Sequence, residues 1–229
     1  MMCDSSRTEI FLPSCESVRS EQTIQLYNRC AETYEQDLAE MNYRAPNLAV
    51  DFLNANFSGS RQEVQVLDVA CGSGLVAKLM VELGFRLFVG VDGSGGMLEQ
   101  AARTGLYQDL RLALLGTQPL PAQPALFDVV IIVGALGVGF APVSVVRELC
   151  HAAKPGGYVC MARGNHTGPA ASRYKEDLER ELKLMEEEGL WSPVGIKLSD
   201  RYMKEPPQIC ERDESQYISG TVYLYKTAS

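Results

Sequence analysis

Two acidic residues and a glycine turn carry the strongest chemical signal in this sequence. The run Val66-Leu-Asp-Val-Ala-Cys-Gly-Ser-Gly74 places Asp68 just ahead of a tight turn, and the amphipathic stretch Leu75–Leu83 follows it. Backbone N–H groups point outward where such a turn opens a helix, and glycine lets a ligand approach the chain. Asp92 ends the next apolar segment, where a ribose-binding acid is expected. These residues predict a site for a nucleotide-like cofactor.

The turn alone does not decide which cofactor binds. Gly72-Ser-Gly74-Leu-Val-Ala77 fits the dinucleotide pattern G-x-G-x-x-[GA], so an NAD-linked oxidoreductase stays open as an alternative. Asp68 favours a cationic ligand, because a carboxylate at this place would repel a pyrophosphate and attract an ammonium or a sulfonium. No Tyr-x-x-x-Lys pair supports hydride transfer. Purely structural roles also stay open for three residues. Asp68 could hydrogen-bond to nearby backbone amides and fix the loop, Asp92 could be a helix N-cap, and Met97 could pack in the core.

Strand and helix signals alternate around these residues. Continuous apolar runs and period-two segments predict strands, and three-to-four spacing predicts helices. Expected strands are 64–69, 86–91, 110–115, 127–133 and 158–162; expected helices are 75–83, 96–103 and 143–153, with a Lys154-Pro-Gly-Gly157 turn. This alternation predicts an α/β, Rossmann-like, doubly wound and mostly parallel sheet.

The two ends of the sequence have a different character. Residues 1–19 are polar without periodicity and are expected to be disordered, and 20–57 are expected to form helices that could act as a lid. Residues 170–229 are expected to hold a long charged helix and two terminal strands, 194–203 and 217–226, paired antiparallel at the sheet edge. No internal repeat or linker interrupts residues 20–229, so one domain is expected, with its cofactor-binding core at 64–163.

Four motifs in order resemble those of the class I S-adenosylmethionine-dependent methyltransferases. Residues 66–74 resemble the first motif of that family, and Gly90-Val-Asp92-Gly-Ser94 together with Met97 resembles the second motif. Phe127–Gly134 resembles the fourth motif, and the Lys154 turn resembles the turn that precedes the fifth strand of the family. The resemblance covers about residues 20 to 226 and implies a seven-stranded sheet. Within this family the chain is most similar to the methyltransferase-like proteins, particularly the member named for the Williams–Beuren syndrome chromosomal region.

The resemblance implies roles for the matched positions. Asp68 and the turn backbone (Ala70, Cys71, Gly72 and Gly74) would hold the methionine end of S-adenosylmethionine, and Asp92 would accept hydrogen bonds from both ribose hydroxyls. The remaining candidates are Gly93, Ser94 and Met97 beside the adenosine, Val133 and Gly134 on the cofactor floor, and Tyr34 in a lid segment. The reaction would be methyl transfer that releases S-adenosylhomocysteine.

Two departures from the family pattern leave the acceptor open. Many relatives place an acid after the third strand to bind the adenine amino group, whereas this chain has Thr117 and Gln118, which can hydrogen-bond adenine without a charge. After the fourth strand, Ala135–Phe140 lacks the aromatic or histidine residues common in relatives. A cofactor-binding protein without its own acceptor, acting through a partner, is therefore a further alternative. His166, after the fifth strand, is the candidate base, whereas Cys71 is interpreted as turn packing.

Composition narrows the partners and the location. The chain has 229 residues and a net charge of −8, which argues against a nucleic-acid surface and favours a small-molecule or protein acceptor. Seven scattered cysteines and two histidines predict no metal site and reduced thiols, hence a cytoplasmic location with the nucleus also open. We expect no membrane contact, because the start has no secretory pattern and the apolar stretch 129–143 is too short to span a bilayer.

Overall fold

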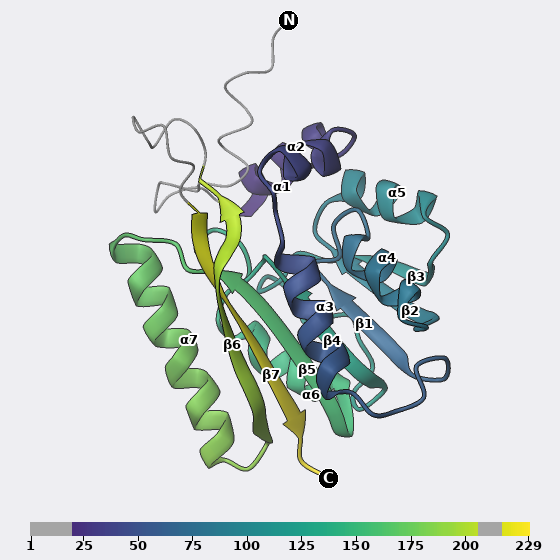
Figure 1. Ribbon diagram of the computed structural model, residues 1–229, viewed down its shortest axis with the longest axis vertical. Coiled ribbons are helices and arrows are strands. Elements are labelled where there is room, and N and C mark those ends of the chain that lie inside the picture. The colour runs from purple at the N-terminus through teal and green to yellow at the C-terminus, as the bar shows by residue number, and fades with distance from the viewer. Residues whose placement is uncertain (1–19, 206–216) are drawn as a thin grey trace, which may run out of the picture.

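The computed structural model describes residues 20–205 and 217–229, and its centre is a seven-stranded sheet in the order β3-β2-β1-β4-β5-β7-β6 (Figure 1). The strands are β1 (Gln65–Val69), β2 (Leu87–Asp92), β3 (Tyr107–Leu112), β4 (Phe127–Val133), β5 (Ala153–Gly164), β6 (Trp191–Lys204) and β7 (Tyr217–Thr227). β1 to β5 are parallel, and β7 pairs antiparallel with β5 and with β6. The predicted doubly wound sheet with a C-terminal antiparallel pair is confirmed.

Helices cover both faces of this sheet (Figure 1). They are α1 (Ser20–Cys30), α2 (Tyr34–Glu40), α3 (Ala45–Asn56), α4 (Leu75–Glu82), α5 (Gly95–Arg103), α6 (Val145–Ala152) and α7 (Pro169–Glu187). One buried cluster joins α3 and α4 to the sheet, and another joins α6 and α7 to the opposite face. The central strands are buried on both sides, which explains why β4 reads Phe-Asp-Val-Val-Ile-Ile-Val with almost no alternation.

Two strand boundaries differ from the sequence prediction. β3 spans Tyr107–Leu112 rather than 110–115, because Tyr107 packs edge-on against Phe88 of β2, with ring centroids 6.1 Å apart. The expected Lys154 turn lies inside β5, where the ladder with β4 shifts register between Phe127 and Val129. Lys154 is held there by Asp128 at 2.9 Å, so the chain bends without leaving the sheet.

The N-terminal helices divide into two groups. The segment 20–57, expected to be helical, forms three helices: the chain turns between Cys30 and Tyr34 and again before Ala45, and Pro46 lies in the first turn of α3. α3 buries Leu53 and Ala49 completely and packs on the sheet, so it belongs to the core rather than to a lid. α1 and α2 lie over the carboxyl ends of the strands, together at the top of Figure 1. The expected disordered segment 1–19 lies outside the described residues.

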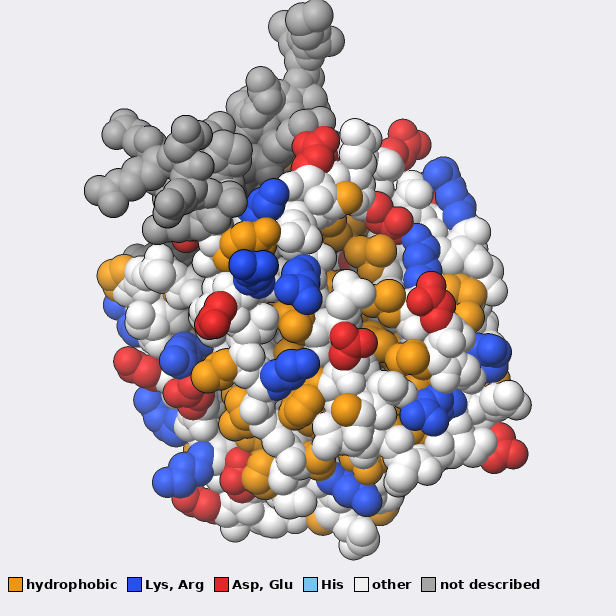
Figure 2. Space-filling model, in the orientation of Figure 1, with side chains coloured by type: hydrophobic (Ala, Val, Ile, Leu, Met, Phe, Trp, Pro, Cys, Tyr) orange, Lys and Arg blue, Asp and Glu red, His pale blue; other side chains and the backbone are white. Residues whose placement is uncertain are grey.

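Charge is mixed on the face seen in Figure 2, where acidic and basic side chains lie interspersed and no extended basic stripe is visible. Nucleic-acid binding would require such a stripe on some face of the molecule. Among residues 20–205 and 217–229, no helix is both long and apolar enough to cross a membrane.

Candidate functional site

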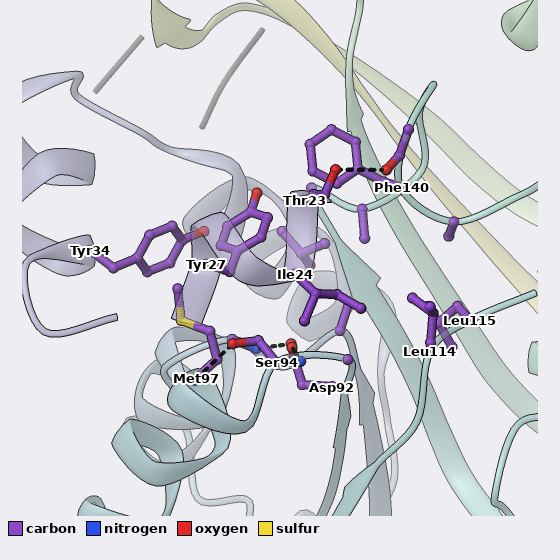
Figure 3. A pocket seen from close by; sticks show the side chains of 18 of the residues that line it. Thr23, Ile24, Tyr27, Tyr34, Asp92, Ser94, Met97, Leu114, Leu115 and Phe140 are labelled. Carbon is purple, nitrogen blue, oxygen red and sulfur yellow. Dashed lines mark hydrogen bonds between the residues drawn. The ribbon is translucent and has the colours of Figure 1, made fainter. Parts of the chain in front are cut away.

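The main pocket lies at the carboxyl ends of β1, β2 and β4, under α1 (Figure 3). Strand order reverses between β1 and β4, which is where ligands bind in open α/β sheets. The pocket encloses about 740 Å³, including its open mouth. Its β1–β2 side comprises Ala70, Gly72, Asp92, Gly93, Ser94 and Met97, and its β4–β5 side comprises Val133, Gly134, Ala135, Gly139, Phe140 and Ala141.

Asp92 organises the β1–β2 side. Its Oδ2 accepts a hydrogen bond from Gly72 N–H at 2.8 Å, and its Oδ1 accepts one from Ser94 N–H at 2.8 Å. Burial raises the pKa of Asp92, and these backbone hydrogen bonds counteract part of that rise. Each carboxylate oxygen keeps a further acceptor position, so two hydroxyl groups of a ligand can still donate to it. Asp92 therefore both fixes the turn and presents an acceptor to the pocket.

The turn has the backbone conformation that its residues suggest. Gly72 and Gly74 have φ values of 54° and 91°, in the left-handed region that favours glycine. Ala70 also has a positive φ of 55°, a strained conformation for a residue with a Cβ. Such strain persists only where the surroundings impose it, and here it directs the Ala70–Gly72 backbone into the pocket wall.

Asp68 lies behind the turn rather than in the pocket wall. It is 1% exposed, and its Oδ2 accepts a hydrogen bond from the Tyr107 hydroxyl at 2.7 Å. Burial raises the pKa of Asp68 to about 7, although the Tyr107 hydrogen bond lowers it. Tyr107 also supports the turn, because a Cβ at Gly74 would lie 3.2 Å from its ring. Direct contact between Asp68 and a ligand therefore stays a prediction. The hydrogen bond between Asp68 and Tyr107 was not predicted from the sequence.

α1 closes the pocket from above. Tyr27 packs against Tyr34 of α2 and Phe140 of the β4–β5 side, with ring centroids 5.9 and 6.3 Å away, so it links the N-terminal helices to that side of the pocket (Figure 3). The Asn28 Oδ1 accepts hydrogen bonds from Ser94 Oγ at 2.7 Å and from Gly96 N–H at 2.9 Å. A Cβ on Gly96 would lie 3.1 Å from the Asn28 backbone, so this glycine permits the close approach of α1 to α5.

Tyr43 and Gly134 meet at the β4–β5 side. Gly134 has a φ of 78°, and a Cβ there would lie 2.1 Å from the Tyr43 hydroxyl. Tyr43 packs edge-on against Tyr202, with ring centroids 5.5 Å apart. Burial raises the pKa of Tyr43 well above its ordinary value, so its hydroxyl stays protonated at neutral pH.

The structure brings most of the predicted site residues together. The predicted residues that line the pocket are Tyr34, Ala70, Gly72, Asp92, Gly93, Ser94, Met97, Val133 and Gly134. Those that do not are Asp68, Cys71, Gly74, Thr117, Gln118 and His166. Thr117, Gln118 and His166 are exposed, and Thr117 lines a neighbouring cavity instead.

Several lining residues were not predicted from the sequence. Leu114 and Leu115 take the place expected for Thr117 and Gln118, because β3 ends earlier and the chain turns sooner. Ile24 and Tyr27 share a helical spacing with Tyr34, and that periodicity was a usable signal. Thr23, Tyr43 and the residues 135–141 carried no distinctive pattern.

The pocket suits an adenosine-type ligand and shows no metal-binding arrangement. Asp92 offers a doubly accepting carboxylate, Met97 and Leu114 offer apolar contact for a base, and the Gly72 turn offers room for a polar chain. Among the described ranges 20–205 and 217–229, no group of three or more His, Cys, Asp and Glu side chains could hold a metal ion.

Comparisons with known proteins fit this geometry. Residues 66–157 match a methyltransferase domain. "Methyltransferase-like protein 27" of Homo sapiens is 48% identical over 180 residues, which are 79% of this chain and 72% of that protein. It bears this name rather than the Williams–Beuren name expected from the sequence. A "Ubiquinone biosynthesis O-methyltransferase" of Albidiferax ferrireducens is 35% identical over 111 residues, which are 45% of this chain and 42% of that protein.

Solved structures agree on the fold. A methyltransferase in complex with the Haloferax volcanii Trm112 methyltransferase activator superposes with a TM-score of 0.65 at 16% identity, covering 93% of this chain and 98% of that chain. A likeness at this identity shows the fold alone. The identity and coverage of the human relative decide the family. The chain belongs to the methyltransferase-like proteins and carries their methyltransferase domain.

Proposed function

We propose that this protein transfers a methyl group from S-adenosylmethionine to a small-molecule or protein acceptor. The observation that carries the proposal is Asp92, a half-buried carboxylate that lines the pocket at the sheet's switch point and is already oriented by the Gly72 and Ser94 amides. Family membership supports the same activity.

On the β1–β2 side, each wall residue would hold one part of the donor. Asp92 would accept hydrogen bonds from the two ribose hydroxyls, and Met97 with Leu114 would pack against adenine. The backbone of Ala70 and Gly72 would bind the methionine end. Asp68 would act through the turn, since its side chain faces Tyr107 rather than the cavity.

When bound, S-adenosylmethionine supplies a sulfonium-activated methyl group that leaves its sulfur for an attacking lone pair. The protein's own task is alignment and the exclusion of water, which together can contribute about 7–11 kcal/mol. Tyr27 and Phe140 would close the pocket from two elements that are far apart in the sequence. The name of the Albidiferax ferrireducens relative makes oxygen the acceptor atom to test first. A protein partner is also worth testing, because a solved structure of this fold contains an activator protein.

Calorimetry with S-adenosylhomocysteine and, separately, with NADH tests the proposal. We expect binding of the first and none of the second. Binding of NADH alone would replace the proposal with the oxidoreductase alternative. Transfer of a labelled methyl group to a cell extract then separates a methyltransferase from a protein that only binds the cofactor.

A further inference from the structure

Arg163 carries a buried positive charge without an anionic partner among the described residues. It is the penultimate residue of β5 and only 2% exposed. Its Nε and Nη1 have no hydrogen-bond partner. None of the ion pairs within residues 20–205 and 217–229 includes it. The guanidinium is therefore desolvated without the compensation that buried charges usually have.

The neighbours of Arg163 compensate only in part. Its Cζ lies 5.6 Å from the centroid of the Tyr174 ring, a cation–π contact. The Tyr223 hydroxyl is a hydrogen-bond partner of the same guanidinium. A π face attracts the charge but accepts no hydrogen bond in the guanidinium plane, so Nε and Nη1 stay without acceptors. A buried guanidinium that is compensated only in part indicates a group that can bind an anionic ligand.

The position of Arg163 connects it to the β4–β5 side of the pocket. The preceding residue, Ala162, accepts a hydrogen bond from Gly134 N–H at 2.9 Å, and Gly134 lines the pocket. Tyr174 donates its hydroxyl proton to the Ala141 carbonyl at 2.7 Å, and Ala141 lines the same pocket. Tyr174 thus contacts both Arg163 and the loop 137–142, and it also lines a second cavity.

That second cavity adjoins the main pocket. It shares Leu115, Gly139, Phe140 and Ala141 with the main pocket, and two side chains of opposite charge, Arg173 and Asp177, also line it. It also meets the first turns of α7, whose N-terminus carries a partial positive charge. The whole chain has a net charge of −8, so an anion requires local cations to bind.

We propose that Arg163 binds an oxyanion of the methyl acceptor, a carboxylate or a phosphate, on the β4–β5 side of the pocket. Tyr174 covers the guanidinium and moves when the anion enters through the second cavity. This inference rests on the proposed function and narrows the acceptor to an anionic molecule. It makes Arg163 an acceptor-binding residue and leaves donor binding to the β1–β2 side.

Benzoate and phenyl phosphate serve as probes in the presence of saturating S-adenosylhomocysteine. We expect one of them to raise the melting temperature of the wild-type protein and to bind in calorimetry. Arg163→Met should weaken that binding by about tenfold or more, the effect of losing a charge-assisted hydrogen bond. Arg61→Met is the matched control, because Arg61 also lies over aromatic rings but has Asn54 as its hydrogen-bond partner at 2.7 Å. It should leave probe binding unchanged.

The outcomes separate the two proposals. If S-adenosylhomocysteine binds but neither probe does, or if Arg163→Met binds the probe as wild type does, the acceptor proposal is overturned and the proposed function stands. If S-adenosylhomocysteine does not bind, both fall. Which probe binds distinguishes a carboxylate from a phosphate.

Stability without probe gives an independent readout. Removing an unpaired buried charge should leave the melting temperature of Arg163→Met unchanged or raised, whereas a structural arginine would lower it. Arg163→Lys keeps the charge and covers the case in which the methionine variant does not fold. It should retain part of the probe binding, and complete loss of S-adenosylhomocysteine binding in Arg163→Lys would contradict our division of the pocket.

Discussion

The two sides of the pocket differ in how completely their polar groups are satisfied. On the β1–β2 side, Asp92 accepts hydrogen bonds from two backbone amides, and Asp68 behind this side accepts one from the Tyr107 hydroxyl. On the β4–β5 side, the loop is largely apolar, and Arg163 behind it has two donors without partners. A side that is satisfied before binding is preorganised for one ligand. A side with an unpaired charge depends on its ligand to complete it, and this contrast is the reason for placing the proposed acceptor site on the β4–β5 side.

Replacing Asp92 should weaken cofactor binding more than any other change considered, because Asp92 organises the β1–β2 side. Asp92→Ala removes the proposed acceptor for the ribose hydroxyls and also leaves the Gly72 and Ser94 amides without their acceptor. Each hydrogen bond to a charged group contributes about 1.5–3 kcal/mol, so we expect S-adenosylhomocysteine to bind about 100-fold more weakly or worse. Calorimetry measures this. Asp109→Ala, an exposed acid of β3, is the control and should change nothing.

Gly134→Ala tests whether the β4–β5 side tolerates any added volume. The new Cβ would lie 2.1 Å from the Tyr43 hydroxyl, and the positive φ adds strain. Gly105→Ala is a matched control, because it has a φ of 66° but nothing within 4 Å. We expect about 1 kcal/mol of destabilisation for Gly105→Ala and about 2 kcal/mol or more for Gly134→Ala in urea unfolding.

A double variant isolates the steric part of that effect. Tyr43→Phe removes the clashing hydroxyl and leaves the ring Cζ at 3.4 Å from the added Cβ. In the Tyr43→Phe protein, Gly134→Ala should lower the free energy of unfolding by no more than Gly105→Ala does. If Gly134→Ala lowers the free energy of unfolding equally with Tyr43 and with Phe at position 43, Tyr43 does not limit the space beside Gly134.

The buried acid behind the β1–β2 side, Asp68, predicts a pH dependence of stability. The folded-state pKa of Asp68 is about 7, above its unfolded value, so the folded state binds more protons between these two values. Stability should therefore decrease as pH rises towards 7, by about 2 kcal/mol between pH 5 and pH 7. Urea unfolding at both values measures the change.

Two variants assign that pH dependence. Asp68→Asn cannot titrate and should flatten the difference between pH 5 and pH 7. Tyr107→Phe removes a hydrogen bond that lowers the pKa of Asp68, so the decrease should continue above pH 7. A wild-type profile that Asp68→Asn leaves unchanged would assign the effect to another group.

The smallest expected effect concerns the contact between α1 and the β1–β2 side. Asn28→Ala removes the acceptor for Ser94 Oγ and Gly96 N–H, at an exposed position where a hydrogen bond contributes about 1 kcal/mol. We expect faster hydrogen exchange in α1 and a few-fold weaker binding of S-adenosylhomocysteine. Arg29→Ala, its exposed neighbour, is the control. Unchanged exchange would mean that packing of Tyr27 alone holds α1.

The contrast between the two sides also explains what could be predicted from the sequence. The alternation of apolar runs and helical spacing was enough to predict the sheet. The glycine turn with Asp92 was enough to predict the β1–β2 side, because the backbone geometry there requires particular residue types at fixed spacing. Arg163 gave no such signal, since its significance depends on burial and on missing partners. Tyr107 was missed for the same reason, because its contact with Asp68 spans 39 residues.

The position of β7 between β5 and β6 has a consequence for synthesis on the ribosome. β6 emerges before β7, and β7 is its only partner among the strands in residues 20–205 and 217–229, so β6 must wait for a later segment to be translated. The β5–β7 ladder, in which Thr221 is the cross-strand neighbour of Arg163, also forms only after β7 is translated. Until then the edges of β5 and β6 that β7 later covers are unpaired, and this interval is when a chaperone has most to protect.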